Sequence, residues 1–382
     1  MEIFFRQIKN NYIIKHIILS LYIASLVLGI YSYSMVNWAN KLASVRRVVI
    51  FLLGIISLIL LKHTLKQYLF FIIGFCITSY SIIVNHGSLE YLLIVIIIFS
   101  LSTINPKTIL KYSTIFIFIN LLILFICSKL GIISNLLFYR DGTLRQSLGT
   151  VYPLAFAGYV FFLCAAYISI NYDKNKIFLQ ILILLSSSLF LLKINGARND
   201  SLFILLMVLC VFSVYIPKKI NKIMSTFGSI VIFSLSILSI FITKLIPYTT
   251  NIYSLLNATF NGRLQFQYMI FNYYKPKLFG QLIPEVGLGG MQTPILNYFY
   301  IDNSYVKLLF MSGILFTILI YLTLIFLIKR LIDNNMYKLV YVLLVIMLAG
   351  IIEDSFINSS MNVFFTIFIT SGEMLATSFK SS

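Results

Sequence analysis

The stretch STFGSIVIFSLSILSIFITKLI, residues 225–246, decides the fold class of this chain. It carries one charged side chain, Lys244, close to its end. A run of about 20 apolar residues is long enough to cross the hydrocarbon core of a bilayer as a helix, and it is too long for a membrane-spanning strand. Because lipid offers the backbone no hydrogen-bond partners, such a run must be helical. The stretch therefore predicts a transmembrane helix.

Runs of this kind recur along the whole chain. Hydrophobic residues make up 60% of the 382 residues and charged residues 10%, which is typical of polytopic membrane proteins and not of soluble domains. We expect an all-α, polytopic integral membrane protein in which residues 1–382 form a single membrane domain. The length criterion gives about 12 transmembrane helices. They are expected at residues 14–36, 46–61, 68–84, 89–104, 109–127, 152–171, 176–193, 201–216, 225–246, 304–328, 338–352 and 361–378.

The distribution of basic residues predicts the orientation. Lys and Arg gather in the breaks on the amino-terminal side and are absent from the short opposite loops near Asn85 and Glu353. By the positive-inside rule the basic side is cytoplasmic, so both termini are expected there. Lys41, Arg46 and Arg47 in the first outer loop are exceptions. The net charge of +18 is attributed to topology and to anionic lipid head groups, and not to nucleic-acid binding.

The longest interval without a spanning run, residues 247–303, is expected to form one large extracytoplasmic loop. A loop of this length is uncommon unless it is functional. Asn261 is expected to cap a short helix that lies in the membrane interface and ends before Pro276. Arg263 then falls in its first turn, where a guanidinium and free N–H groups form a good phosphate site. The alternative is that Arg263 only covers the helix end.

Arginine is concentrated in the outer segments, whereas the inner breaks carry mostly lysine. Because a guanidinium binds phosphate oxygens through two parallel hydrogen bonds, this difference predicts an outward-facing site for phosphate or diphosphate. The alternative is that these side chains reach lipid phosphates from the helix ends. A turn at Asp141 and Gly142 is expected to hold Arg140 and Arg145 together at the membrane face, and Arg198 stands in a second compact turn.

Asp302, Asn303 and Ser304 precede a long apolar run, so each is a candidate helix N-cap. Asp302 is also a candidate general base that takes a proton from a hydroxyl group at the outer surface. The two roles are compatible if Asn303 or Ser304 caps the helix. Glu353 and Asp354 form an outer acidic pair, for which helix capping or pairing with an outer Arg is preferred to a metal site.

No metal or cofactor is expected. The histidines show no ligand spacing, and the four cysteines fall in or at the ends of apolar runs. The first outer loop, residues 37–45, contains no carboxylate.

Three segments together resemble the O-antigen and capsular polysaccharide repeat-unit polymerases (Wzy type) and the related O-antigen ligases. RQSLGTVYPLAFAG, residues 145–158, resembles the family pattern R-x-S-L-G-F-x-H-P-N-x-x-G, and NGAR, residues 195–198, resembles its small-residue Arg turn. The segment from GRLQFQY to YIDNSYVKLLFMSGILFTIL, residues 262–319, resembles the large outer loop and the helix after it. The chain departs from the family at Tyr152 and Leu154, in place of His and Asn, and at Asp302, where ligases often have His.

The resemblance implies a metal-independent glycosyltransferase that joins undecaprenyl-diphosphate-linked oligosaccharide units at the outer face of a bacterial plasma membrane, with diphosphate as the leaving group. The lipid bilayer is a partner, and a chain-length regulator and a flippase of the same pathway are further expected partners. The alternatives are an O-antigen ligase and a lipid-linked glycan flippase. A flippase is expected to carry polar residues or Gly and Pro breaks within its spans, whereas polarity here is concentrated at one face.

The resemblance and the residue chemistry together assign the site. The candidates are Asp302 and Arg263 as catalytic residues, Arg140, Arg145, Arg198 and Arg263 as diphosphate ligands, and Glu285, Asn303 and Tyr305 as glycan contacts.

Overall fold

The computed structural model describes residues 2–140, 142–172, 174–260, 262–291 and 296–379. It is predominantly helical, and nine helices within those ranges are long and apolar enough to cross a membrane. The apolar helices α4 and α14 are shorter. The predicted helical membrane class is therefore confirmed, while the number of 12 spans stays a prediction.

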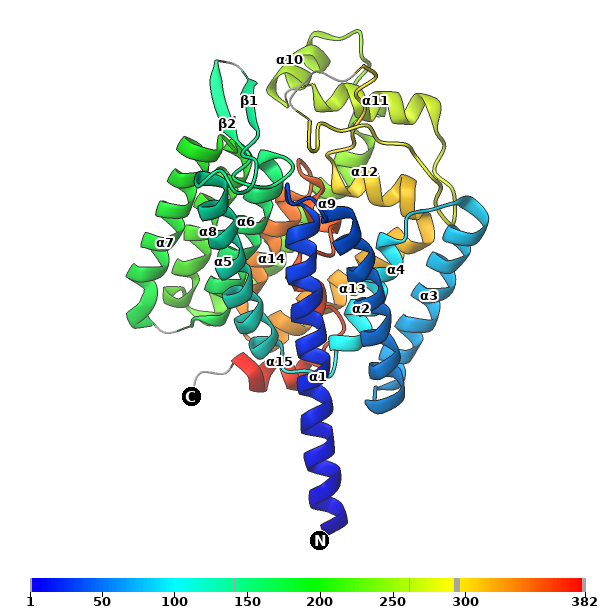
Figure 1. Ribbon diagram of the computed structural model, residues 1–382, viewed down its shortest axis with the longest axis vertical. Coiled ribbons are helices and arrows are strands. Elements are labelled where there is room, and N and C mark those ends of the chain that lie inside the picture. The colour runs from blue at the N-terminus through cyan, green and yellow to red at the C-terminus, as the bar shows by residue number, and fades with distance from the viewer. Residues whose placement is uncertain (1, 141, 173, 261, 292–295, 380–382) are drawn as a thin grey trace.

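The helices pack into one bundle with a small hairpin and two short helices at one end (Figure 1). In chain order the elements are α1 (Glu2–Ser32), α2 (Ala39–Leu60), α3 (Leu65–Asn85), α4 (Glu90–Leu101), α5 (Pro106–Lys129), β1 (Leu137–Arg140), β2 (Thr143–Gln146), α6 (Pro153–Ile170), α7 (Ile177–Phe190), α8 (Arg198–Phe212), α9 (Lys218–Leu245), α10 (Asn251–Thr259), α11 (Arg263–Tyr273), α12 (Ser304–Lys307), α13 (Ile314–Asp333), α14 (Tyr337–Ala349) and α15 (Gly372–Phe379).

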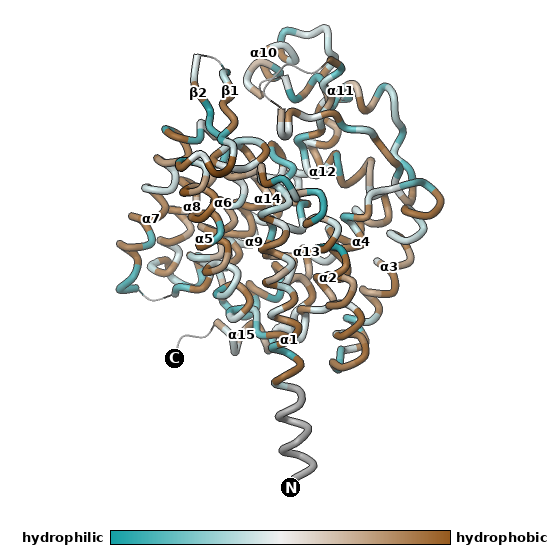
Figure 2. Tube along the Cα trace, in the orientation of Figure 1, coloured by the Kyte–Doolittle hydropathy of each residue, from teal (hydrophilic) through white to brown (hydrophobic). Residues whose placement is uncertain are grey.

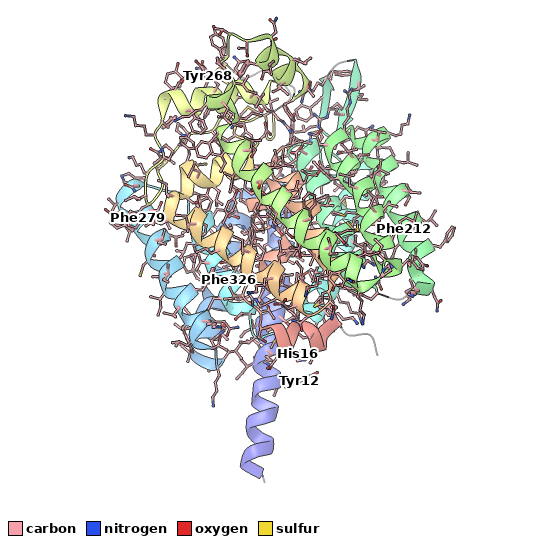
Figure 3. The ribbon with its side chains drawn as sticks, turned by 180° about the vertical axis from the view of Figure 1, so that it is seen from behind. Tyr12, His16, Phe212, Tyr268, Phe279 and Phe326 are labelled. Carbon is pink, nitrogen blue, oxygen red and sulfur yellow. The ribbon has the colours of Figure 1, made fainter. Side chains whose placement is uncertain are left out.

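The bundle has an inner layer and an outer layer. In α4 every residue from Tyr91 to Leu101 is buried, and most of α6 and α14 is buried as well. The outer helices α2, α3, α5, α7, α9 and α13 expose many large apolar side chains, and Figure 2 colours these helices by the hydropathy of their residues. Phe212 lies near the edge of the bundle in Figure 3, and Phe326 is also exposed. Such surfaces are costly in water and favourable in lipid, which explains the arrangement.

Close packing of α9 depends on small polar residues. Its buried face carries Ser225, Ser229, Ser236 and Ser239, spaced at three, four and seven residues. Small side chains let helix backbones approach closely where hydrophobic driving force is absent. This face of α9 contacts α14 and α12, and so brings α12 against the bundle core.

The expected last span does not form one helix. Residues 361–378 contain a 3-10 turn, Val363–Ile367, and the short helix α15, with most of the side chains buried. Arg330 of α13 donates hydrogen bonds to the carbonyls of Phe368 and Thr370. Irregular backbone is tolerated at membrane depth when protein groups satisfy it, which explains how an apolar segment avoids a continuous helix here.

The hairpin and the short helices α10 and α11 lie at the end of the bundle opposite the start of α1 and opposite α15 (Figure 1). The helix predicted in the long loop is present as α11, which begins at Arg263 after Gly262 in a left-handed conformation. Asn261, the predicted cap, lies outside the described residues. The placement of this end outside the cytoplasm stays a prediction.

Candidate functional site

A cavity of about 590 Å³ lies at the hairpin end of the bundle. Its walls come from the hairpin, the starts of α6, α8 and α11, the segment before α12 and the segment after α14. Segments far apart in sequence therefore meet around one space. The charged residues in its walls are Arg140, Arg145, Asp200, Arg263, Asp302, Glu353 and Asp354.

Arg263 is the centre of the charged wall. Its Nε lies 3.2 Å from Asp302 Oδ2 and its Nη1 lies 3.3 Å from Glu353 Oε1. Nη1 also donates to the carbonyl of Ile352 over 2.6 Å. Burial lowers the pKa of Arg263, but Glu353 and Asp302 outweigh burial and leave the pKa raised. The guanidinium is thus a permanent cation with two carboxylate partners.

Asp302 does not cap α12, because Asn303 is the N-cap residue of that helix. The Asn303 side chain accepts from the backbone N–H groups of Tyr305 and Val306 at 2.9 and 3.1 Å. Burial raises the pKa of Asp302 to about 7, with Arg263 opposing the shift and the neighbouring carboxylates adding to it. A carboxyl group with a pKa near the working pH has the property that general-base catalysis requires.

The hairpin positions Arg145. Arg145 pairs with Phe138 across the two strands, is 5% exposed, and lies over the ring of Tyr152 at 5.7 Å. Gly196 makes room for it, because a Cβ atom there would lie 2.6 Å from Arg145 Cγ. Gly196 also has a positive φ of 76°, so both the close packing and the backbone conformation favour glycine at this position. Arg145 Nε is buried and has no hydrogen-bond partner within the described part of the chain.

The four predicted Arg residues come together. A second space of about 40 Å³ is lined by Arg140, Arg145, Arg198 and Arg263, together with Gly196 of the NGAR turn. The hairpin turn contains Gly142 with a positive φ, while Asp141 lies outside the described residues. The two turns singled out in the sequence, which are more than 50 residues apart, therefore face one another.

Lys307 organises the opposite part of the wall, and the sequence reasoning missed it. Its Nζ lies 2.8 Å from Glu285 Oε2 and 3.0 Å from Asp354 Oδ2, and 4.4 Å above the ring of Tyr300. The hydroxyl of Tyr300 donates to Asp354 Oδ2. The sequence signal for this cluster was a Lys near the start of an apolar run. A cation buried there requires acidic partners, so its position indicates an ion pair.

Three predicted glycan contacts lie outside the residues that line the main cavity. Glu285 binds Lys307 and accepts from the N–H of Ile301 over 3.0 Å. Tyr305 is fully buried, and its hydroxyl donates to the carbonyl of Met347 over 2.7 Å. Asn303 caps α12. In this structure each of these groups supports the cavity wall from behind.

In the acidic pair after α14, Glu353 is paired with an Arg, as preferred from the sequence, whereas Asp354 is paired with a Lys. Glu353 contacts Arg263, and its Oε1 also accepts from the Asn199 amide over 3.0 Å. Asp354 contacts Lys307. Within the described residues, no group of three His, Cys, Asp or Glu side chains is arranged to hold a metal ion.

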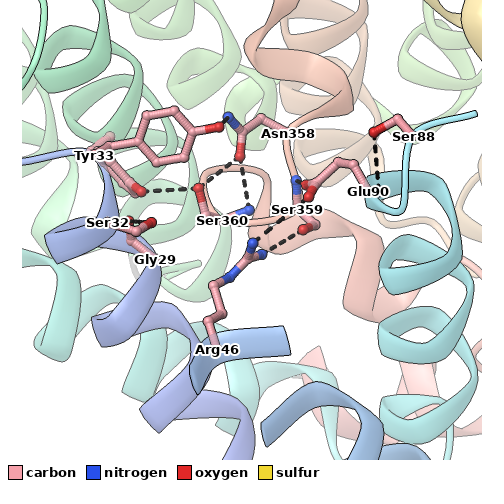
Figure 4. Close-up of polar contacts among 10 residues, drawn as sticks. Gly29, Ser32, Tyr33, Arg46, Ser88, Glu90, Asn358, Ser359 and Ser360 are labelled. Atoms are coloured by element: carbon pink, nitrogen blue, oxygen red, sulfur yellow. Dashed lines mark hydrogen bonds and ion pairs between the residues drawn. The ribbon is translucent and has the colours of Figure 1, made fainter. Parts of the chain in front are cut away.

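Arg46, an exception to the charge rule, fixes a loop at the edge of the cavity (Figure 4). Its Nη2 donates to Ser359 Oγ and its Nη1 lies 3.7 Å from Glu90 Oε2. Glu90 accepts in turn from the N–H of Ser359 over 2.7 Å. The adjacent Asn358 lines the cavity and donates to the hydroxyl of Tyr33 over 3.1 Å. This basic residue is therefore committed to a structural network.

Comparison with models of known protein families finds none that matches this chain. Comparison with curated protein sequences also finds no match.

Proposed function

We propose that this protein is a polysaccharide repeat-unit polymerase, a glycosyltransferase that joins undecaprenyl-diphosphate-linked oligosaccharide units at the outer face of a bacterial plasma membrane. One observation carries the proposal: Arg145 from β2 and Arg263 from the start of α11 line one cavity with Asp302, a carboxyl group of pKa about 7. A diphosphate leaving group needs concentrated positive charge, and an attacking hydroxyl needs a base.

In this proposal the four Arg residues bind the diphosphate of the donor, and Asp302 takes the proton of the attacking hydroxyl. The sugar units lie against the aromatic and glycine residues of the cavity, since ligand sites typically combine such surfaces with a few placed polar groups. The walls supply Tyr152, Phe266, Gly287, Gly289, Tyr298 and Tyr300. The walls that contact the glycan are supported from behind by Glu285, Asn303 and Tyr305, which do not contact the glycan themselves in this proposal.

The test uses purified protein in liposomes and the lipid-linked oligosaccharide extracted from cells in which the gene is deleted. We expect a ladder of joined units from the wild type. Arg145→Ala should lose at least about 100-fold in transfer, because it removes a charged donor from the leaving group. Arg47→Ala is the matched control, since Arg47 is exposed on α2.

The products distinguish the proposal from its alternatives. Transfer of the glycan to a different lipid acceptor, without a ladder, would identify a ligase. Movement of the intact donor across the bilayer, without bond formation, would identify a flippase. Unchanged ladders from correctly folded Arg145→Ala protein would overturn the assignment of the anion site.

A further inference from the structure

The carboxyl group of Asp200 is unaccounted for by the roles above. Asp200 is the third residue of α8, is 3% exposed, and lines the main cavity. Among the residues that the structure describes, its Oδ2 has no hydrogen-bond partner. A buried polar atom without a partner costs free energy, so such an atom in a cavity wall requires a specific explanation.

We infer that Asp200 is a catalytic residue that carries a proton and donates a hydrogen bond to an oxygen of the leaving diphosphate. The inference rests on the proposed function and adds a proton donor to it.

The distribution of charge favours a proton on Asp200 over its neighbours. Arg263 contacts Asp302 and Glu353 within 3.3 Å, and Glu353 gains a further hydrogen bond from Asn199. No such contact is made by Asp200 Oδ2. When several carboxyl groups share a buried site, they cannot all ionise, and the proton remains where the charge has the poorest partners.

A second buried group without a partner, on Arg145, also supports binding of the diphosphate in the main cavity. Arg145 Nε is buried without a partner, and Arg145 lines the same cavity as Asp200. A neutral Asp200 and a cationic Arg145 together present an O–H and an N–H donor to an oxyanion. An ionised Asp200 would instead repel the diphosphate, and in a buried site the repulsion would be strong.

The structural alternative is that Asp200 is an ionised acid in the first turn of α8. A negative charge there is favoured by the helix dipole. The two explanations differ in the charge on Asp200, and therefore in how it responds to Asn, which is similar in shape, donates hydrogen bonds and cannot ionise.

The proposed step balances as follows. The acceptor hydroxyl oxygen forms a bond to the anomeric carbon and gives its proton to Asp302. The bond between the anomeric carbon and the phosphate oxygen breaks, and its electron pair leaves with the diphosphate. The proton of Asp200 is shared with a diphosphate oxygen as negative charge develops, while Arg145 and Arg263 remain charged.

The experiment compares Asp200→Asn with Asp200→Leu in the liposome transfer assay. We expect Asn to retain transfer within about threefold of wild type and Leu to lose about 100-fold, the usual effect of removing one oxyanion donor. Equal, large losses in both variants would show that the negative charge is needed and would overturn the inference. Full activity in Leu would overturn it as well. In the same assay, the Asp302→Asn protein should be inactive whereas the Asp200→Asn protein is active.

A pH profile keeps the inference testable if the Leu variant does not fold. The charged groups that act electrostatically on Asp200 are Glu353 from the segment after α14, Arg263 from α11 and Arg145 from β2. Wild-type transfer should fall at alkaline pH as Asp200 loses its proton, and Asp200→Asn should lack that fall while keeping the rise near neutral pH. A persisting alkaline fall would refute the role. Absence of transfer by the wild type itself would instead refute the proposed function.

Discussion

Asp302 should make transfer strongly dependent on pH near neutrality. Its pKa is raised from the ordinary value of 3.8 to about 7. A base acts only when it is deprotonated, so about one Asp302 in ten is competent at pH 6 and about nine in ten at pH 8. We therefore expect an approximately tenfold increase in transfer rate over that interval. A carboxyl group with the ordinary pKa would give no change.

The cause of the raised pKa can be tested with Glu353→Gln. Burial is the main cause, and the negative charge of Glu353 adds to it. Without that charge, Asp302 no longer shares the Arg263 guanidinium with Glu353. The pH at which the transfer rate rises should therefore fall by about one unit. Rates are measured in liposomes at fixed ionic strength. A flat profile between pH 6 and 8 from folded wild-type protein would refute the reasoning.

Stability supplies a check that does not depend on activity. A raised carboxyl pKa means that the folded protein binds the proton more tightly than the unfolded chain does. The contribution of Asp302 to the free energy of unfolding therefore falls by about 4 kcal/mol as pH rises from about 4 to about 8. The effect of Asp302→Asn on the free energy of unfolding, measured relative to wild type, should therefore be more stabilising, or less destabilising, at pH 8 than at pH 5. Thermal unfolding in detergent measures this, and an identical effect at both pH values would contradict it.

Two further predictions concern the walls of the cavity. Lys307→Met leaves two partly buried carboxylates without their cation and should lower stability by at most about 3–5 kcal/mol, whereas the exposed Lys277→Met should have little effect on the unfolding temperature. Gly196→Ala places a methyl group against Arg145 and should impair transfer more than Gly142→Ala, which has the same backbone constraint and no atom within 4 Å of the new methyl. Equal transfer by the two glycine variants would show that close packing against Arg145 is unimportant.

Hydropathy and capping chemistry predicted much of the fold. Long apolar runs specify helices because lipid leaves the backbone no alternative. Asn303 was a recognisable cap, and its use there left Asp302 available for the cavity. The segment 361–378 shows where composition is insufficient, because Arg330 supplies backbone hydrogen bonds from a distant helix. Only tertiary contacts decide whether an apolar run is one helix.

The candidate site was predictable in part for the same reason. Arg145 and Arg198 stood out because they occur in compact turns, and the structure brings both turns together. Tyr305 was grouped with Asp302 by sequence adjacency, but the first turn of α12 directs it into the bundle towards Met347. Asp200 was not predicted as a site residue, because an acid in the first turn of a helix has an ordinary explanation. Its missing partner is visible only in three dimensions.

The two partners of Arg263 also impose an order on the biogenesis of the protein. Glu353 follows Arg263 by 90 residues, so it is synthesised roughly 5–20 s later at ordinary rates of translation. During that interval the guanidinium has no Glu353 to pair with and is most stable among water and lipid head groups. The charged wall can close only when the segment after α14 arrives. Completion of the cavity therefore follows the synthesis of Glu353, and a nascent chain arrested before Glu353 should be embedded in the membrane yet inactive.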